Sequence, residues 1–363
     1  MKIYNFSAGP ACLPEPVLNA TQKAAIEYKE TGMSIMEMSH RSEPIVDLFH
    51  ETTSKVRELL DVPSNYHVLW LQGGASMQFA MVPMNLLSNT STADYIETGS
   101  WSTKAITECN KVAKANVIAS SKQDIFSYIP KEYKQKIDSK YLHITSNNTI
   151  YGTQYKVFPK VDNRDGCLVA DMSSDIFSAQ INVSDFGLIY AGAQKNMGPA
   201  GVTLVIVRDD LVHNELDHLP TMMRYDTHVK KDSMFNTPPV LSVFVVNETL
   251  KWIEDQGGVG SIENSNKTMS EKLYAEIERN MLFRSPVAIE DRSTMNIPFV
   301  FNDNSMDDND FLQFCDARGL KTLKGHRSVG GFRASIYNAM PMEGVDALIK
   351  AMQDYEDLSL IHI

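Results

Sequence analysis

The feature that most constrains this fold is an alternation of short apolar runs with longer amphipathic stretches. The runs predicted as strands are His67–Leu71, Ala93–Glu97, Tyr141–Thr145, Cys167–Ala170, Leu188–Ala191 and Val202–Val207. Helical stretches lie between most of them. This alternation predicts an α/β fold, in which an open, mostly parallel sheet carries helices on both of its faces.

A smaller second domain is predicted after the helical run Leu241–Asp255, where Gln256-Gly257-Gly258 breaks the pattern. Its expected elements are a helix near Asn264–Asn280, a strand at Asn296–Phe301, a helix at Asn309–Arg318, a strand near Arg333–Ile336 and a helix at Val345–Tyr355. We therefore expect an N-terminal arm (residues 1–15), a large domain (16–258) and a small α+β domain (259–363).

The acidic balance of the chain limits its partners. The formal net charge is -11, so the surface would on average repel nucleic acid and anionic membranes. No stretch approaches the roughly 18 apolar residues of a transmembrane helix, and no leader pattern opens the chain, so we expect a cytoplasmic protein. The four cysteines lie far apart, which favours reduced structural thiols and no metal site.

One lysine lies in a segment of small residues between two predicted strands. Lys195 is the single cation of Tyr190–Gly201, so it is expected to be partly desolvated. Desolvation lowers the pKa of an ammonium group, and Schiff-base chemistry requires a nearly neutral amine. For this segment alone, a turn lysine that reaches solvent is the alternative.

Two other features lie at the ends of predicted strands, where open α/β sheets bind ligands. Asp171 follows Cys167–Ala170, and its carboxylate could pair with a pyridinium nitrogen through a charge-assisted hydrogen bond of about 1.5–3 kcal/mol. It could instead cap the following turn through Ser173 and Ser174. The loop within Gln72–Phe79 opens a helix, and such a loop suits a phosphate, although a simple tight turn is the alternative.

Together these motifs resemble the class V aminotransferases, which are fold-type-I, aspartate-aminotransferase-like pyridoxal-phosphate enzymes. The resemblance covers nearly the whole chain, from Phe6 to about Ile349. It rests on Phe6-Ser7-Ala8-Gly9-Pro10, Ser39-His40-Arg41-Ser42, the Gly73 loop, Ala170-Asp171-Met172-Ser173-Ser174, Ala191–Gly201, Asn236-Thr237-Pro238-Pro239 and Gly325-His326-Arg327-Ser328-Val329-Gly330-Gly331.

The resemblance implies pyridoxal 5'-phosphate as cofactor. Lys195 would form the Schiff base and then move the proton of the substrate α-carbon, while Asp171 would pair with the ring nitrogen. Further implied cofactor contacts are a phosphate cradle, a stacking aromatic ring and a hydroxyl at the ring oxygen, supplied by Ala75, Ser76, Gln194, Trp101 and Thr149. Residues such as Trp101 and Thr149, taken alone, are more often ordinary core or capping residues.

A homodimer with shared active sites is also implied. Asn236 and Thr237 resemble family residues that reach the cofactor phosphate from the neighbouring subunit. Each site of the assembly would therefore contain residues from two chains.

The substrate is expected to carry two anionic groups. His40-Arg41 and His326-Arg327 are two His-Arg pairs on an acidic chain, and an arginine fork binds carboxylate or phosphate with two parallel hydrogen bonds. Each pair alone fits a surface or a structural ion pair. By resemblance we assign the substrate phosphate to Arg41, His326 and Arg327, with His40 nearby, and the α-carboxylate to Arg333, with some of these side chains coming from a partner subunit.

The implied reaction exchanges an amino group between L-glutamate and 3-phosphohydroxypyruvate, giving O-phospho-L-serine and 2-oxoglutarate, a step of serine biosynthesis. Departures from the family pattern are Ala8 in place of a second serine, Ala75 in place of a third glycine, and Val240-Leu241-Ser242 after the proline pair. Ala75 keeps its N–H, whereas Ala8 removes a possible hydroxyl contact to substrate.

Three alternatives remain at this stage. One is another class V enzyme, such as a cysteine desulfurase, although Cys315 lies in a predicted amphipathic helix where a structural thiol is expected. Another is a nucleotide-binding protein, since Gly325–Gly331 partly imitates a Walker loop without its Lys-Ser/Thr. The third is a non-catalytic relative that binds the cofactor, against which intact Lys195, Asp171 and Arg333 argue.

Overall fold

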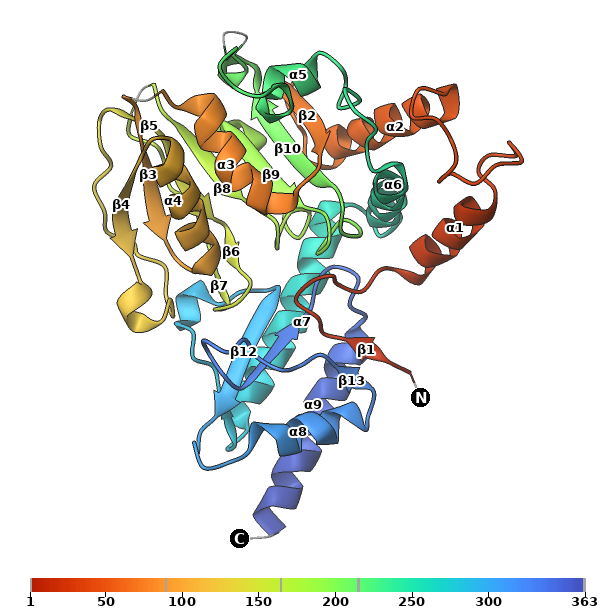
Figure 1. Ribbon diagram of the computed structural model, residues 1–363. Helices are drawn as coiled ribbons and strands as arrows, with labels where there is room; N and C mark the ends of the chain where they lie inside the picture. Colours follow the sequence, from red (N-terminus) through yellow and green to blue (C-terminus); the bar gives the residue numbers. More distant parts are fainter. Residues whose placement is uncertain (1, 89, 164, 214–215, 362–363) are drawn as a thin grey trace.

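The computed structural model describes residues 2–88, 90–163, 165–213 and 216–361. Within these residues a seven-stranded sheet forms the centre of the upper lobe in Figure 1. In pairing order its strands are β2 (Tyr66–Leu71), β10 (Thr203–Arg208), β9 (Leu188–Gly192), β8 (Cys167–Asp171), β5 (Ser139–Thr145), β3 (Thr92–Glu97) and β4 (Lys114–Ser120). β10 runs antiparallel to both β2 and β9, and the other strand pairs of this sheet are parallel. The predicted mostly parallel α/β sheet is confirmed.

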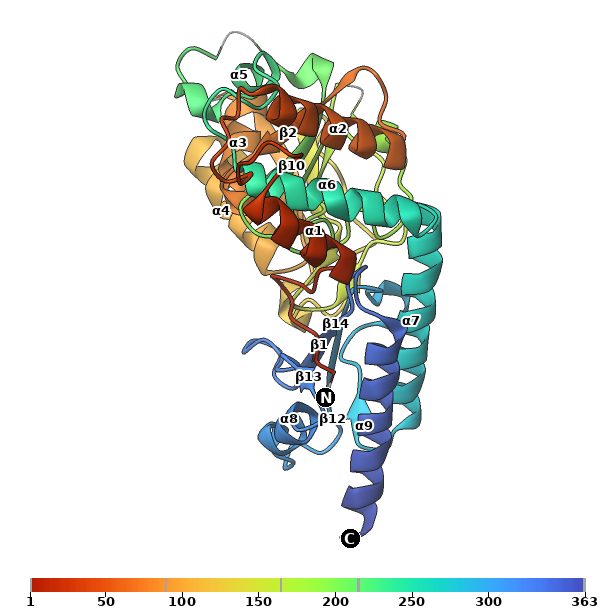
Figure 2. The ribbon, with the colours of Figure 1, turned by 90° about the vertical axis from the view of Figure 1, so that its right-hand side faces the viewer.

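Helices cover both faces of this sheet (Figures 1 and 2). One layer contains α3 (Gly74–Leu86), α4 (Ser100–Val112) and α5 (Tyr225–Val229), and the other contains α1 (Glu15–Ile26), α2 (Glu43–Leu59) and α6 (Val240–Asp255). Successive side chains of a strand point to opposite faces of the sheet. In β8, Leu168 and Ala170 pack with the layer of α1, α2 and α6, whereas Cys167 and Val169 pack with the layer of α3, α4 and α5. Among the described residues no helix combines the length and apolar character that a membrane crossing requires.

The edge strand β4 was not predicted, because its one buried side chain is polar and its apolar side chains are only partly buried or exposed. Asn116 is its buried residue and donates to Asp94 Oδ1 over 3.1 Å, while Val117 is 47% exposed. A strand at the edge of a sheet has a neighbouring strand on one side only, so its side chains are less completely covered. Its sequence therefore lacks the apolar run that identifies a central strand.

The lower lobe holds a three-stranded antiparallel sheet with helices packed against it (Figure 1). Its elements are α7 (Val259–Arg279), β11 (Phe283–Arg284), β12 (Asn296–Phe301), α8 (Asp308–Asp316), β13 (Leu320–Lys321), β14 (Phe332–Ser335) and α9 (Met342–Ile361). The break before α7 is made by two glycines with positive φ, Gly257 at 94° and Gly258 at 81°. The first helix of this lobe therefore begins at Val259, earlier than the Asn264 that we predicted.

The N-terminal segment crosses from the lower lobe to the upper one. β1 (Tyr4–Asn5) pairs with β13, and Phe6 lies in the apolar core of the lower lobe. The chain then reaches α1, which packs beside α6 (Figure 2). We propose residues 1–15, 16–258 and 259–363 as arm, large domain and small domain, supported by the separate apolar cores of the two lobes.

A short hairpin lies between the lobes. β6 (Asn147–Asn148) pairs with β7 (Thr153–Gln154), and both strands are buried. Its turn requires glycine, because Gly152 has φ +76° and a Cβ there would lie 2.2 Å from Pro298 Cδ. The hairpin thus brings the polar residues that follow β5 against the small domain.

Candidate active site

Three loops that follow strands of the large sheet meet the small domain around one cavity of about 530 Å³. The start of α3 follows β2, Asp171 ends β8, and Lys195 follows β9. Their convergence follows from the parallel sheet, because the carboxyl ends of parallel strands meet at the same edge. The cavity is lined by Ala8, Gly9, Gly74, Ala75, Ser76, Phe79, Ser100, Trp101, Lys104, Thr145, Asn147, Thr149, Ile150, Asp171, Ser173, Ser174, Gln194, Lys195, His326, Arg327 and Arg333.

Lys195 is a buried amine that faces this cavity. The residue is 9% exposed, and its Nζ donates to Thr149 Oγ1 over 2.8 Å. Burial lowers the pKa of Lys195 to about 8; Arg333 acts in the same direction, and Asp171 and Asp175 oppose it. The predicted desolvation of this lysine is confirmed, and the alternative of a solvent-facing turn lysine does not fit the structure.

Asp171 is a buried carboxyl group at the end of β8. Its Oδ1 accepts from Ser173 N over 3.0 Å and from Ser173 Oγ over 2.6 Å. Burial raises its pKa, although the bonds from Ser173 and the charge of Lys195 oppose the rise. The turn-capping contact with Ser173 is therefore real, and it orients a carboxyl group that also lines the cavity.

The amino end of α3 offers backbone N–H groups to the same cavity. Gly73 precedes the helix with φ +89°, and a Cβ there would lie 2.6 Å from Met77 Cβ, so the turn requires glycine. Ala75 and Ser76 lie in the first turn, where N–H groups have no partner within the helix. Together with Gln194, these donors make a place for a phosphate or another anion.

Cations gather on the small-domain side of the cavity. Arg333 donates from Nη1 to the main-chain oxygen of Thr149 over 3.2 Å, which fixes its guanidinium beside Lys195. Burial lowers the pKa of His326, and the charges of Arg333, Arg327 and Lys104 lower it further. These mutual effects mark a positive field that suits an anionic ligand.

Four sequence-predicted residues lie outside this cavity within one chain. Arg41 is exposed, and His40 is only partly buried. Asn236 lines a different cavity beside β2, and the main-chain oxygen of Thr237 accepts from Gln72 Nε2 over 3.2 Å. The remaining predicted residues, Ala75, Ser76, Trp101, Thr149, Asp171, Gln194, Lys195, His326, Arg327 and Arg333, all line the cavity.

Sequence reasoning missed several lining residues. Lys104 lies one helical turn after Trp101, with Nζ 4.4 Å from the centre of its ring. The i, i+3 spacing of an aromatic residue and a cation was the signal that could have found it. Thr145 and Asn147 end or follow β5, so the strand-end argument used for Asp171 applies to them as well.

Comparisons with known proteins agree with this geometry. The family model for Aminotransferase class-V matches residues 3–348. A curated phosphoserine aminotransferase of Bacillus cereus is 51% identical over 357 residues, which cover 98% of each chain. The solved phosphoserine aminotransferase of Bacillus circulans subsp. alkalophilus is 46% identical, with 99% of each chain covered and a TM-score of 0.95. The PLP-bound enzyme of Trichomonas vaginalis is 38% identical, with 97% and 100% covered and a TM-score of 0.91.

Proposed function

The chain belongs to the class-V aminotransferase family, and from that premise we propose that it exchanges an amino group between L-glutamate and 3-phosphohydroxypyruvate. The products are O-phospho-L-serine and 2-oxoglutarate, which is a step of serine biosynthesis. The observation that carries this proposal is the convergence of Lys195, Asp171 and the cations His326, Arg327 and Arg333 on one cavity.

The cofactor of this reaction is pyridoxal 5'-phosphate, and the cavity fits it. Among the described residues, Thr145 Oγ1 and Trp101 Nε1 are buried polar atoms without a hydrogen-bond partner, and both residues line the cavity. The buried Asp171 faces the same space, where a ring nitrogen would satisfy it. When bound, the cofactor accepts the electrons released at the substrate α-carbon.

The chain itself supplies the reacting amine, the group that carries the proton, and the side chains that would hold the cofactor ring. Lys195 would provide the amine that bonds to the cofactor aldehyde, and its pKa of about 8 makes the uncharged form more populated near neutral pH than in an ordinary lysine. Beside a bound cofactor, the same Lys195 amine would hold or release the α-proton of the substrate. Asp171 would pair with the ring nitrogen and keep it protonated, and Trp101 would offer its ring for stacking; Lys195 Nζ is 5.8 Å from the centre of the Trp101 ring.

Substrate anions are assigned to the small-domain side. Arg333 is proposed for the α-carboxylate, because it lies next to Lys195 and contributes to lowering the pKa of that amine. His326 and Arg327 are proposed for the phosphate of phosphoserine or the side-chain carboxylate of glutamate, with His40 and Arg41 added from a second chain. A single chain thus supplies part of the phosphate pocket.

We infer a homodimer with shared active sites from the predicted site residues that lie outside the active-site cavity of their own chain. His40, Arg41, Asn236 and Thr237 match the family motifs but do not line the cavity of their own chain. A partner chain that places them at the cavity would complete both the phosphate cradle, through Asn236 and Thr237, and the substrate pocket. A cytoplasmic location is proposed as well; all four cysteines are free, as expected in a reducing compartment.

The test is a coupled assay of purified protein with glutamate and 3-phosphohydroxypyruvate. Formation of 2-oxoglutarate that depends on both substrates and on the cofactor supports the proposal. Hydroxypyruvate lacks the phosphate and is the matched control, because it makes no use of His326 and Arg327. Equal turnover of hydroxypyruvate and the phosphorylated substrate would overturn the substrate assignment.

A further inference from the structure

The turn after β8 separates two cavities. Asp171, Ser173 and Ser174 face the active-site cavity, whereas Met172, Asp175 and Ile176 face a second one. This second cavity, of about 670 Å³, lies between the turn, the hairpin β6–β7, α7 and the segment before β12. Asp175 is therefore a carboxyl group directly behind the residues that we assign to the cofactor.

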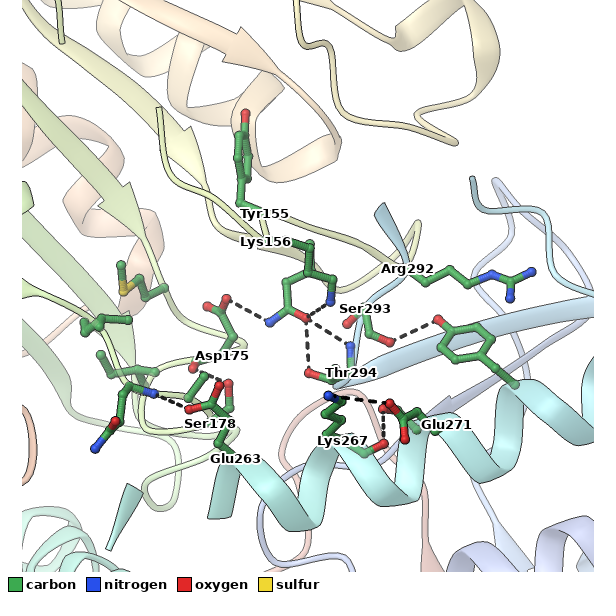
Figure 3. A pocket seen from close by; sticks show the side chains of 18 of the residues that line it. Tyr155, Lys156, Asp175, Ser178, Glu263, Lys267, Glu271, Arg292, Ser293 and Thr294 are labelled. Carbon is green, nitrogen blue, oxygen red and sulfur yellow. Dashed lines mark hydrogen bonds and ion pairs between the residues drawn. The ribbon is translucent and has the colours of Figure 1, made fainter. Parts of the chain in front are cut away.

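The charges on the rim of the second cavity are satisfied near the surface. Lys267 and Glu271 pair along α7, and Arg292 pairs with Glu278. Figure 3 shows Asp175 apart from Lys267, Glu271 and Arg292, on the side of the cavity that belongs to the large domain. Asp175 is thus the acid of this cavity that lies nearest to the active-site residues.

Asp175 is held by hydrogen bonds from two directions. Its Oδ1 accepts a short hydrogen bond from Ser146 Oγ, and its Oδ2 accepts from Gln154 Nε2 over 3.3 Å. Gln154 Oε1 in turn accepts from Thr294 N over 3.0 Å and from Thr294 Oγ1 over 3.1 Å. Asp175 therefore joins the end of β5 to the start of the small-domain strand β12.

Ser146 connects Asp175 to the main chain of Asp171. Both the N–H and the hydroxyl of Ser146 lie 3.0 Å from the main-chain oxygen of Asp171. A hydroxyl has one hydrogen to donate, so Asp171 and the carboxylate of Asp175 compete for it. An ionised Asp175 draws this hydrogen to itself, and a protonated Asp175 can donate to Ser146 and release it to Asp171.

We infer that Asp175 is a positioning residue of the transamination reaction, which acts through Ser146 on Asp171 and through its charge on Lys195. This inference rests on the proposed function. Asp175 does not line the active-site cavity; it fixes the turn that presents Asp171, and its link through Gln154 to Thr294 ties that turn to the domain that carries Arg333.

The charged and titratable groups around Asp175 set the sign of its effect. Burial raises the pKa of Asp175 to about 7, Asp171 raises it as well, and Lys195 lowers it. In return Asp175 raises the pKa values of Lys195, Lys156 and Tyr337. An ionised Asp175 therefore favours the protonated form of the Lys195 nitrogen.

The experiment compares wild-type holoenzyme with D175N. The amide keeps the size of the side chain and an acceptor for Ser146, but it has no charge, and its N–H₂ group would face the donor of Gln154. We expect kcat to fall about tenfold or more, because the turn loses its link to the small domain. We also expect the pH midpoint of the cofactor's visible absorption band to move down by roughly half a unit or more.

Two further variants separate position from charge. S146A removes the connecting hydroxyl but keeps the carboxyl group of Asp175, so kcat should fall while the spectral midpoint moves down less than it does in D175N. E271Q changes an exposed acid on the rim of the same cavity and should leave both readouts unchanged.

A folded D175N with kcat within about twofold of wild type and an unmoved midpoint would overturn the inference. If D175N does not fold, an S146A with wild-type kcat overturns it equally. A wild-type protein without a visible band or activity would refute the proposed function instead, so the two failures are distinguishable.

Discussion

Replacement of Arg333 by glutamine tests the proposed carboxylate site. The guanidinium is half-buried, and its Nη1 is fixed by the main-chain oxygen of Thr149 at 3.2 Å. Truncation of one partner of a desolvated, hydrogen-bonded charge pair costs about 2–5 kcal/mol. We therefore expect kcat/KM to fall roughly 30- to 5,000-fold for glutamate and for phosphoserine, because both carry an α-carboxylate.

The same change has a predictable effect on Lys195. The charge of Arg333 contributes to lowering the pKa of Lys195, so its removal raises that pKa. Because the free amine is lost as its pKa rises, the acid limb of the activity profile should move to higher pH. Arg333→Lys keeps the charge without the planar fork, and it should restore the pH profile while restoring little of the substrate affinity.

The assay is steady-state kinetics in both half-reactions over a pH series, with Arg284→Gln as a control. Arg284 is an exposed arginine of the small domain outside the active-site cavity, so its loss changes net charge equally. Unequal losses for the two substrates, with phosphoserine alone affected, would refute Arg333 as the α-carboxylate ligand and favour a phosphate role.

Three other changes test the partner of the ring nitrogen, the shared site and the hairpin turn. Asp171→Asn should lower kcat roughly 10- to 150-fold, from about 1.5–3 kcal/mol, measured in cofactor-saturated enzyme. Arg41→Ala and Lys195→Ala chains, each inactive with phosphoserine, should regain activity when mixed under subunit exchange, because one site of the mixed dimer is intact; no recovery would contradict shared sites. Gly152→Ala should lower the free energy of unfolding in urea by about 1–3 kcal/mol, because its Cβ overlaps Pro298, whereas Gly260→Ala in α7 should not.

The strand-end argument explains why the centre of the site could be predicted. Asp171 ends an apolar run and Lys195 follows another, and a parallel sheet brings such positions to one edge whatever their separation in sequence. The antiparallel direction of β10 could not be predicted from the sequence, because a buried strand has the same apolar pattern whichever way it runs in the sheet.

Contacts between the two domains could not be predicted from the sequence. The bond between Gln154 and Thr294 joins residues far apart in the chain, and nothing in either segment encodes the partner. Asp175 was overlooked for a related reason, since its importance comes from the turn that sets it behind Asp171. The placement of Arg41 and Asn236 depends on a second chain, so neither the sequence nor one chain fixes their contacts.

Borohydride reduction of the purified holoenzyme tests the central claim most directly. The visible absorption band should disappear, and peptide mass mapping should find the reduced pyridoxyl group on Lys195, with no label in Lys195→Ala. A label on another lysine of the folded wild-type protein, or a protein that takes up the cofactor without forming a reducible bond, would contradict the account.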